Sequence, residues 1–577
     1  MTNLLFGDSE VTRGISGDVS SRETGRTYGN QVSGARVSAV GETSRYTVAL
    51  FGAFAVMIGI KAALLASGAL PFNSDEAIVA LMARHILAGE RPIFFYGQAY
   101  MGSLDAYLAA LGFRLFGQEV WVIRALQALL YLGTVLTTVR IASMGFGSRR
   151  SGVLAAWFLA IPTVTTSLYT VVSLGGYGEA LLIGNIILLL VLRIAKKLER
   201  QMHSPTVVEL LAFGFACGLG FWASGLTLVY SLPALVFFII ANSFFFGRRI
   251  FKNVVLVALG GVLGASPWLY YAFQHGSDDL LIQLGGGMIS GVQRAPLPVQ
   301  ILQHVFNFAV FGVSAILGLR PSWEFRWLAF PLIPLVLVFW GYVAVQILKK
   351  IRSNAVKGVE ALILGVGFCL VAGFVFTPFG ADPSGRYFLP FSILLALLAS
   401  DFITRFSSQS RQIGWALAGL ILVFNLWGTV ECAIRNPPGL TTQIDHIAQI
   451  DHRSDPALAK FLLANNERRG YSNYWVAYPL AFESQEELIF TPRLPYHEDF
   501  RYTLRDDRYP TYDDQVERSE RAAYITTNHP ALDDRLREGF SRLKISWKEA
   551  QIGDYHVFYA LSQHVRPEEL GLGVESR

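Results

Sequence analysis

Cysteine is scarce in this 577-residue chain. The three cysteines, Cys217, Cys369 and Cys432, lie within or at the end of apolar stretches and show no paired spacing. This pattern predicts small packing residues rather than disulfides or a metal site. The sequence also lacks an internal repeat, a Walker phosphate-binding loop, a His-Glu-x-x-His motif and a Cys-x-x-Cys motif. ATP-driven transport and zinc proteolysis therefore lose their usual sequence support.

Charged residues are few as well, at 16% of the chain, whereas hydrophobic residues make up 52%. A soluble domain carries more charge and less apolar surface, so the composition predicts a polytopic membrane protein. A helix that crosses the bilayer needs roughly 20 apolar residues. Apolar stretches of about this length predict about eleven spans, near residues 46–70, 119–143, 152–172, 180–195, 206–223, 226–246, 253–273, 327–348, 359–377, 387–405 and 412–434.

Basic residues collect in short loops between these stretches, which predicts that the loops are cytoplasmic. They are Arg149, Arg150, Lys196, Lys197, Arg200, Arg248, Arg249, Lys252, Lys349, Lys350, Arg352, Arg405 and Arg411. The segment around Asp75 and everything after Arg435 then lie outside the cytoplasm. The apolar stretch Ile301 to Leu319 would break this alternation if it spanned, so we expect it to be re-entrant or interfacial. The net charge of +5 follows from these loops and the N-terminal tail and indicates no nucleic-acid partner.

The chain divides into three regions. Residues 1–45 are polar and predict a disordered cytoplasmic tail, residues 46–434 form the transmembrane domain, and residues 435–577 form an extracytoplasmic domain in which charge and tyrosine become frequent. The last region predicts a small α/β or α+β domain, of which we take α/β, because a helical stretch alternates with short strand-like runs. The helix is expected at 456–465, and strands at 474–477, 488–490, 523–526, 543–547 and 556–561.

An acidic pair, Asp75 and Glu76, stands directly after the first apolar stretch. The apolar residues that follow have helical spacing, which predicts a short amphipathic helix lying along the membrane interface. An acidic pair held at this depth suits a lipid-linked substrate. A structural alternative stays open, because Asn73 and Glu76 have the spacing of a capping box and acids favour the first turn of any helix.

Several short motifs carry a resemblance to a known family. They are Ser74-Asp75-Glu76-Ala77, Gly89-Glu90-Arg91-Pro92, Tyr96-Gly97-Gln98, Met101-Gly102-Ser103-Leu104-Asp105-Ala106 and Gly385-Arg386-Tyr387-Phe388-Leu389-Pro390. Over roughly residues 46 to 430 the chain resembles the GT-C glycosyltransferases, and among them the protein mannosyltransferase and lipid A aminoarabinose transferase-like enzymes. The resemblance implies a mainly α-helical, multi-span enzyme of the inner (cell) membrane, with an essential acid in the first external loop and a polyprenyl-phosphate sugar as donor.

Glycosyl transfer from such a donor needs a base for the acceptor proton and a cation for the departing phosphate. Asp75 is the candidate base, with Glu76 beside it as a second catalytic candidate. A single, inverting displacement needs only one carboxylate in this role. The candidate phosphate ligands are Arg386, Arg124 and Arg84, because a guanidinium binds phosphate in a bidentate fork. Arg124 could instead extend to the interface, and Arg386 could merely anchor a helix end.

Further candidates for substrate binding are Tyr96, Gln98, Asp105, Glu179 and Tyr387. Tyr96 could stack on a sugar, although aromatic belts occur on any membrane protein. Glu179 follows glycines that let the backbone approach a ligand, although it could simply stabilise a helix N-terminus, and Asp105 could face solvent. We expect no obligatory cofactor or metal, but Asp75, Glu76 and Asp105 leave a divalent cation open as an alternative.

The sequence thus predicts a membrane enzyme that moves one sugar from a polyprenyl-phosphate carrier to a lipid, glycan or protein acceptor on the outer face. One alternative is a transporter or flippase for a lipid-linked glycan, although the duplicated halves usual in transporters are not evident. Another is a glycan polymerase or ligase, which the position of the acidic pair disfavours by resemblance only.

Overall fold

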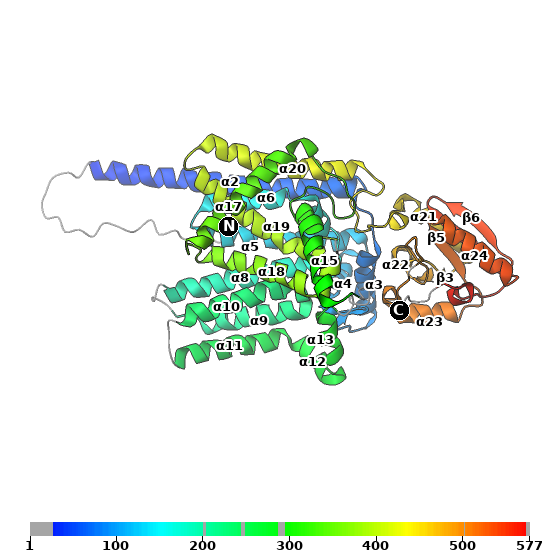
Figure 1. Ribbon diagram of the computed structural model, residues 1–577. Helices are drawn as coiled ribbons and strands as arrows, with labels where there is room; N and C mark the ends of the chain where they lie inside the picture. The colour runs from blue at the N-terminus through cyan, green and yellow to red at the C-terminus, as the bar shows by residue number, and fades with distance from the viewer. Residues whose placement is uncertain are drawn as a thin grey trace.

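The computed structural model describes residues 27–199, 204–243, 248–286, 295–382, 384–500 and 502–572, and side chains from residue 44 onward except 243–249. The chain forms a long helical bundle with a smaller α/β domain at one end (Figure 1). This arrangement confirms the predicted fold class. The bundle helices are α2 (Thr27–Ala66), α5 (Val120–Phe146), α6 (Arg149–Ala160), α7 (Val164–Tyr169), α8 (Tyr177–Glu199), α9 (Val207–Ala223), α10 (Leu228–Ser243), α11 (Arg248–Gly264), α17 (Ile333–Arg352), α18 (Val359–Phe376), α19 (Leu389–Phe406) and α20 (Arg411–Ile434).

Among the described residues, nine helices are long and apolar enough to cross a membrane, or ten if α11 and the sharply bent α12 (Ser266–His275) form one span. The predicted number of eleven was therefore too high. The expected span at 152–172 divides into α6, which ends at Ala160, and α7, which begins at Val164. Pro162 lies between them, and it lacks the backbone N–H that a continuous helix would need there. The expected span at 206–223 is the shorter apolar helix α9.

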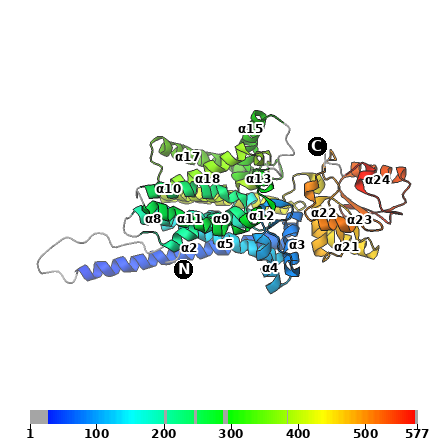
Figure 2. The ribbon, with the colours of Figure 1, turned by 90° about the horizontal axis from the view of Figure 1, so that it is seen from below.

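Short elements lie across the end of the bundle that faces the α/β domain (Figures 1 and 2). They are α3 (Ser74–Ala88), β1 (Phe94–Phe95), β2 (Gln98–Gly102), α4 (Leu104–Phe116), α13 (Asp278–Leu284) and α15 (Leu297–Phe306). The stretch Leu297–Ile316 is long and apolar enough to span. Its first part, α15, nevertheless stands at a steep angle to the bundle helices in both views, which is the orientation that the interfacial interpretation requires.

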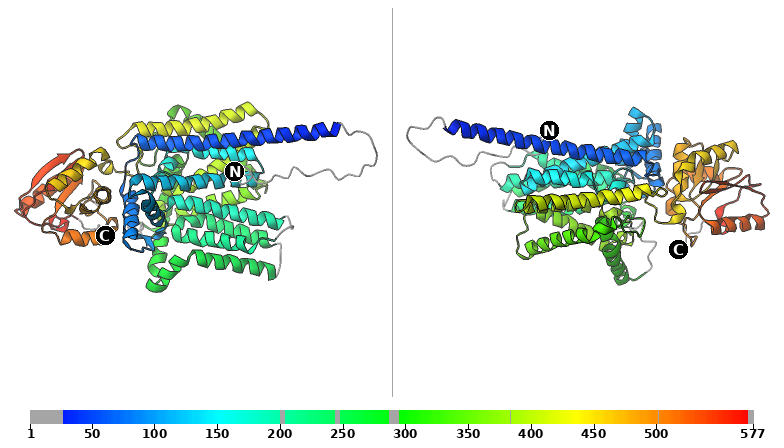
Figure 3. Two further views of the ribbon diagram at one scale, coloured as in Figure 1. Left: turned by 180° about the vertical axis from the view of Figure 1, so that it is seen from behind. Right: turned by 90° about the horizontal axis from the view of Figure 1, so that it is seen from above.

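The loops with clustered basic residues lie at the bundle end away from the α/β domain, and α3 lies at the near end (Figures 1 and 3). Helix α2 begins at Thr27 and projects beyond the bundle at the far end. Helix therefore covers residues 27–45 of the tail for which we expected disorder, whereas residues 1–26 lie outside the described residues. Lengthening an existing apolar helix avoids the cost of nucleating a new one.

The C-terminal domain has a five-stranded sheet in the order β4-β3-β5-β7-β6, in which β3 is parallel to β4 and β5 while β7 is antiparallel to β5 and β6. An α/β domain is thus confirmed. Its helices and strands are α21 (Asp455–Ala464), β3 (Arg469–Tyr471), α22 (Tyr474–Glu483), β4 (Ile489–Thr491), α23 (Pro510–Glu517), β5 (Ala523–Thr527), α24 (Pro530–Arg542), β6 (Lys548–Ile552) and β7 (Tyr555–Tyr559).

Two of the expected strands in this domain were wrong. Residues 474–477 begin helix α22, because the side chain of Asn473 accepts a hydrogen bond from the Trp475 amide and caps the helix. Residues 543–547 connect α24 to β6, which starts at Lys548. The first of these two corrections matters for function, because α22 is a helix through which this domain contacts α3 of the bundle.

The C-terminal domain packs directly on the bundle. The ring of Phe482 on α22 lies 5.6 Å from Phe72 and 6.0 Å from Phe113 of the bundle, measured between ring centroids. One buried apolar cluster runs from α3 and α4 into the interior of the C-terminal domain. The two parts therefore share a core rather than being joined by a loose tether.

Candidate functional site

Asp75 lies in the first turn of α3, at the junction between the bundle and the C-terminal domain. The side chain of Asn73 accepts a hydrogen bond of 3.0 Å from the Glu76 amide and so fixes where the helix begins. The phenol of Tyr474 on α22 donates a 2.5 Å hydrogen bond to Oδ1 of Asp75. The hydroxyl of Ser74 donates to the backbone carbonyl of the same tyrosine. The candidate base is therefore held between two domains.

Glu76 points the opposite way and meets Arg124. Arg124 donates from Nε and Nη2 to the two carboxylate oxygens of Glu76, at 3.0 and 2.9 Å, and also to the backbone carbonyls of Leu70 and Pro71. Glu76 is fully buried and Arg124 is 9% exposed. This ion pair ties the start of α3 to α5. It gives both residues a structural role, and their predicted catalytic and phosphate-binding roles stay predictions.

Arg84 and Tyr96 belong to a polar network at the domain junction. Arg84 donates to the side chain of Gln118 and to the carbonyl of Phe482, at 2.8 and 3.1 Å. Tyr96 donates a 2.5 Å hydrogen bond to Glu90, and burial together with this carboxylate raises the pKa of Tyr96 above its usual range. These contacts place both side chains in the junction. Their predicted parts in phosphate and sugar binding stay predictions.

Asp105 and Glu179 lie together inside the bundle end, each 2% exposed. Asp105 accepts hydrogen bonds from Gln127, at 3.1 Å, and from the Ser173 hydroxyl. Burial raises the pKa of the Asp105 carboxyl. The solvent-facing alternative for Asp105 was therefore wrong, and the predicted contact of either acid with substrate stays a prediction.

Arg386 and Tyr387 begin the short turn that leads into α19. The Arg386 guanidinium pairs with Asp382 at 2.5 Å and lies 5.1 Å from the centroid of the Tyr387 ring. The carboxyl of Asp382 is also the acceptor for the Ser384 amide, which fixes the turn. Arg386 is thus presented from the bundle toward the same end as Asp75.

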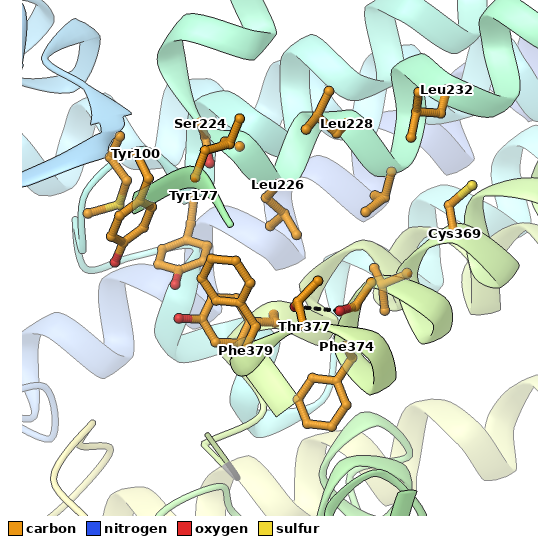
Figure 4. A pocket seen from close by; sticks show the side chains of 17 residues that line it. Tyr100, Tyr177, Ser224, Leu226, Leu228, Leu232, Cys369, Phe374, Thr377 and Phe379 are labelled. Carbon is orange, nitrogen blue, oxygen red and sulfur yellow. Dashed lines mark hydrogen bonds between the residues drawn. The ribbon is translucent and has the colours of Figure 1, made fainter. Parts of the chain in front are cut away.

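An apolar cavity of about 240 Å³ opens between α10 and α18. Figure 4 shows Tyr100, Tyr177 and Phe379 gathered at one end of it, and Leu232 and Cys369 toward the other. Tyr387 also lines the cavity. Burial raises the pKa of Tyr100, and the charges that act on it most strongly are those of Arg386, Arg508, Asp75 and Asp382. At this end of the cavity Arg386 lies against the ring of Tyr387, and the charges of Asp75 and Arg508 act on Tyr100.

Arg508 and Tyr474 of the C-terminal domain are site residues that the sequence did not predict. The guanidinium of Arg508 lies 5.6 Å from the centroid of the Tyr474 ring. Gln98, with its amide oxygen turned toward Arg508, accepts hydrogen bonds of 2.7 and 2.8 Å from it. Arg508 stands in a polar stretch after Asp506 and Asp507, for which solvated charge is the ordinary interpretation. No local signal shows that this stretch folds back onto the bundle.

Asp506 is buried beside Arg508. Burial, together with the charge of Asp75, raises the pKa of Asp506 to about 7. An acid in a polar stretch is ordinarily solvated, and Asp506 departs from this pattern. The carboxyl at 506 is therefore a titrating neighbour of the site near neutral pH.

The acids proposed as an alternative metal site turn to different partners. Asp75 meets Tyr474, Glu76 meets Arg124, and Asp105 meets Gln127 and Ser173. In the part of the chain that the structure describes, no group of three or more His, Cys, Asp or Glu side chains could hold a metal ion. The prediction that no metal is obligatory is still to be tested.

Comparisons with known proteins bear on the whole arrangement. Residues 103–271 match the family described as dolichyl-phosphate-mannose-protein mannosyltransferase. The crystal structure of ArnT from Cupriavidus metallidurans in the apo state is similar with a TM-score of 0.53 and 12% identity, over 90% of this chain and 98% of that one. The chain has the GT-C fold. No curated protein sequence matches it.

A second structure of ArnT from Cupriavidus metallidurans, bound to undecaprenyl phosphate, is similar to this chain with a TM-score of 0.50 and 14% identity, over 89% of this chain and 99% of that one. The GT-C fold of the present chain accordingly includes the C-terminal domain as well as the bundle. Within this fold, Asp75 and Arg508 both contact Tyr474 where the two parts join. Arg386 lies against the ring of Tyr387, which lines the tyrosine end of the cavity.

Proposed function

We propose that the protein transfers a sugar from a polyprenyl-phosphate carrier to a lipid, glycan or protein acceptor at the outer membrane surface. The observation that carries the proposal is the apolar cavity between α10 and α18, with tyrosines at its polar end. Arg386 lies against one of them, Tyr387, and the charge of Asp75 acts on another, Tyr100. Apolar walls suit an isoprenoid chain, and a polar end with a guanidinium suits the sugar phosphate. A flippase breaks no bond, so it needs neither a base nor a phosphate-binding cation for catalysis at one end of such a cavity.

The similar proteins support the same class of donor. The family that matches residues 103–271 is described by dolichyl-phosphate-mannose, and the similar ArnT structure contains undecaprenyl phosphate. Both descriptions name an isoprenoid phosphate. We take this shared chemistry, and not the sugar or the acceptor of either protein, as the donor class proposed here.

In the proposed reaction, Asp75 takes the proton of the acceptor hydroxyl as its oxygen attacks the anomeric carbon. The bond between that carbon and the phosphate oxygen breaks, and the electron pair leaves with the phosphate, which Arg386 binds. A single displacement inverts the anomeric carbon and uses one carboxylate. Tyr474 orients Asp75 by its hydrogen bond, and the pair of Glu76 with Arg124 fixes the helix that carries it.

The proposed orientation places the N-terminus in the cytoplasm and the C-terminal domain outside. Its support is the gathering of basic loops at the bundle end away from that domain. In a bacterial cell this corresponds to a multi-pass protein of the inner membrane. A reporter at the C-terminus that works only outside the cytoplasm is expected to be active, and an inactive one paired with an active cytoplasmic reporter would overturn the orientation.

The function is tested by mass spectrometry of lipid-linked sugars and surface glycans from cells with the gene, without it, and with Asp75→Asn. Loss of the gene is expected to leave a polyprenyl-phosphate sugar accumulated and a glycosylated product absent. The Asp75→Asn cells should show the same change at normal protein levels. Unchanged lipid-linked sugars and glycans in both strains would overturn the proposal.

A further inference from the structure

The charged side chains that the bundle alone supplies at the polar end of the cavity do not favour the binding of a phosphate. At the polar end of the cavity, the positive charge of Arg386 is offset by Asp382 at 2.5 Å. Asp75 adds a further negative charge that acts on the same Tyr100. The three groups together carry net negative charge, so they would repel the phosphate of a donor. A second cation at this place would remove the repulsion.

Arg508 is that second cation, and it comes from the C-terminal domain. Asp506 beside it has a pKa of about 7, so near neutral pH it offsets only part of the charge of Arg508. The charge of Arg508 acts on Tyr100, alongside Arg386, and on Tyr474. Its Nε atom is buried and has no hydrogen-bond partner among the described residues. A buried N–H donor without a partner carries a desolvation penalty, and a hydrogen bond to a ligand oxygen would remove it.

The turn between β1 and β2 is shaped around the same arginine. Gly97 has a φ of +69°, and a Cβ atom at this position would lie 3.1 Å from Cδ of Arg508. The amide oxygen of Gln98, turned toward Arg508, accepts from its terminal nitrogens. The bundle therefore holds the guanidinium at a fixed place next to Gly97 and Gln98, although the arginine belongs to the other domain.

We infer that Arg508 binds the phosphate of the lipid-linked donor together with Arg386, so that the C-terminal domain completes the active site. The inference rests on the proposed function. As the bond between the anomeric carbon and the phosphate oxygen breaks, negative charge grows on the phosphate, and both guanidinium groups stabilise it. The domain after Arg435 then forms part of the site that binds the donor.

The test measures binding of two lipids to the full-length purified protein: undecaprenyl phosphate and undecaprenol, which lacks the phosphate. Arg508→Gln is expected to weaken binding of undecaprenyl phosphate by about 10- to 100-fold, the value of a hydrogen-bonded charge, and to leave undecaprenol binding unchanged. Arg508→Lys should recover only part of the loss because a point charge lacks the fork. Arg518→Gln, on an exposed arginine of the same domain, is the matched control.

Equal binding of undecaprenyl phosphate by the wild type and Arg508→Gln would overturn the inference. If the wild type itself binds the phosphate and the alcohol equally, the proposed function fails instead, so the two failures are distinguishable. If Arg508→Gln lowers the melting temperature, the lipid binding of Arg508→Lys is the test instead. If Arg508→Lys weakens binding of undecaprenyl phosphate but not of undecaprenol, the inference is supported. An equal loss of binding for both lipids, or no loss for either, overturns it.

Discussion

Tyr474 donates a hydrogen bond of 2.5 Å to Asp75 although 399 positions of sequence separate the two residues. Burial and the charge of Asp75 raise the pKa of the Tyr474 phenol well above its usual range, so the phenol stays protonated. The bond occupies one carboxylate oxygen and fixes the direction of the other. The position of the candidate base therefore depends on correct docking of the C-terminal domain.

Asp75→Asn is expected to lower the transfer rate by roughly 10²- to 10⁴-fold, the usual loss when a general base is removed. The amide keeps the size of the side chain and can still accept from Tyr474, so expression and melting temperature should stay near those of the wild type. The measurement is product formation by purified protein in lipid vesicles. Asp279→Asn, an exposed acid in the first turn of α13, is the control. Wild-type turnover in Asp75→Asn would rule out this base.

Tyr474→Phe is expected to slow transfer by about 10- to 100-fold, because it removes one hydrogen bond to a charged group and keeps the ring. The ring still contacts Arg508, so binding of undecaprenyl phosphate should not change. A loss of turnover without a loss of lipid affinity would identify Tyr474 as a positioning residue. An equal fall in both would mean that the substitution disturbs the whole junction.

Glu76→Gln is expected to destabilise the protein, because it leaves the guanidinium of Arg124 buried without its charge partner. Breaking a buried ion pair typically costs about 3 to 5 kcal/mol. Thermal unfolding in detergent should show a clearly lower melting temperature. Glu119→Gln, an exposed acid at the start of α5, should melt like the wild type. A Glu76→Gln protein with full stability and no turnover would instead favour the predicted catalytic role of Glu76.

The pKa of about 7 for Asp506 predicts a dependence of stability on pH. In the unfolded chain this carboxyl loses its proton near its ordinary value of about 4, whereas the folded protein retains the proton until about pH 7. The folded state therefore binds more protons between these values, and its stability falls as the pH rises through that range. Asp506→Asn should flatten the fall in melting temperature between pH 5 and pH 8.

Other buried acids contribute in the same direction, so the comparison must be between variants. Glu483, with a pKa of about 7, and Asp507, with a pKa of about 6, are raised chiefly by burial as well. Asp514→Asn, on an exposed acid, should keep the wild-type slope. An Asp506→Asn profile parallel to that of the wild type would contradict the assigned pKa.

Local features of the sequence were enough to predict most of the apolar spans, the helix that begins at Ser74, and the place of Asp75 in its first turn. These depend on hydropathy and capping over a few residues. The pairing of Glu76 with Arg124 was not predicted, because it joins side chains that are 48 positions apart. Arg508 was missed for the same reason, since its place is set by how one domain docks on the other.

For the proposed polyprenyl-phosphate carrier, the volume of the cavity determines which part of the lipid the protein can distinguish. About 240 Å³ is far too little to enclose an isoprenoid chain that reaches across a bilayer leaflet, and Leu232, toward the end of the cavity away from the tyrosines, is 52% exposed. Only the units next to the phosphate fit inside, and the remainder must trail among the surrounding lipids. We therefore expect the protein not to distinguish carriers by tail length, so that a carrier shortened to a few isoprene units should serve as well as a full-length one.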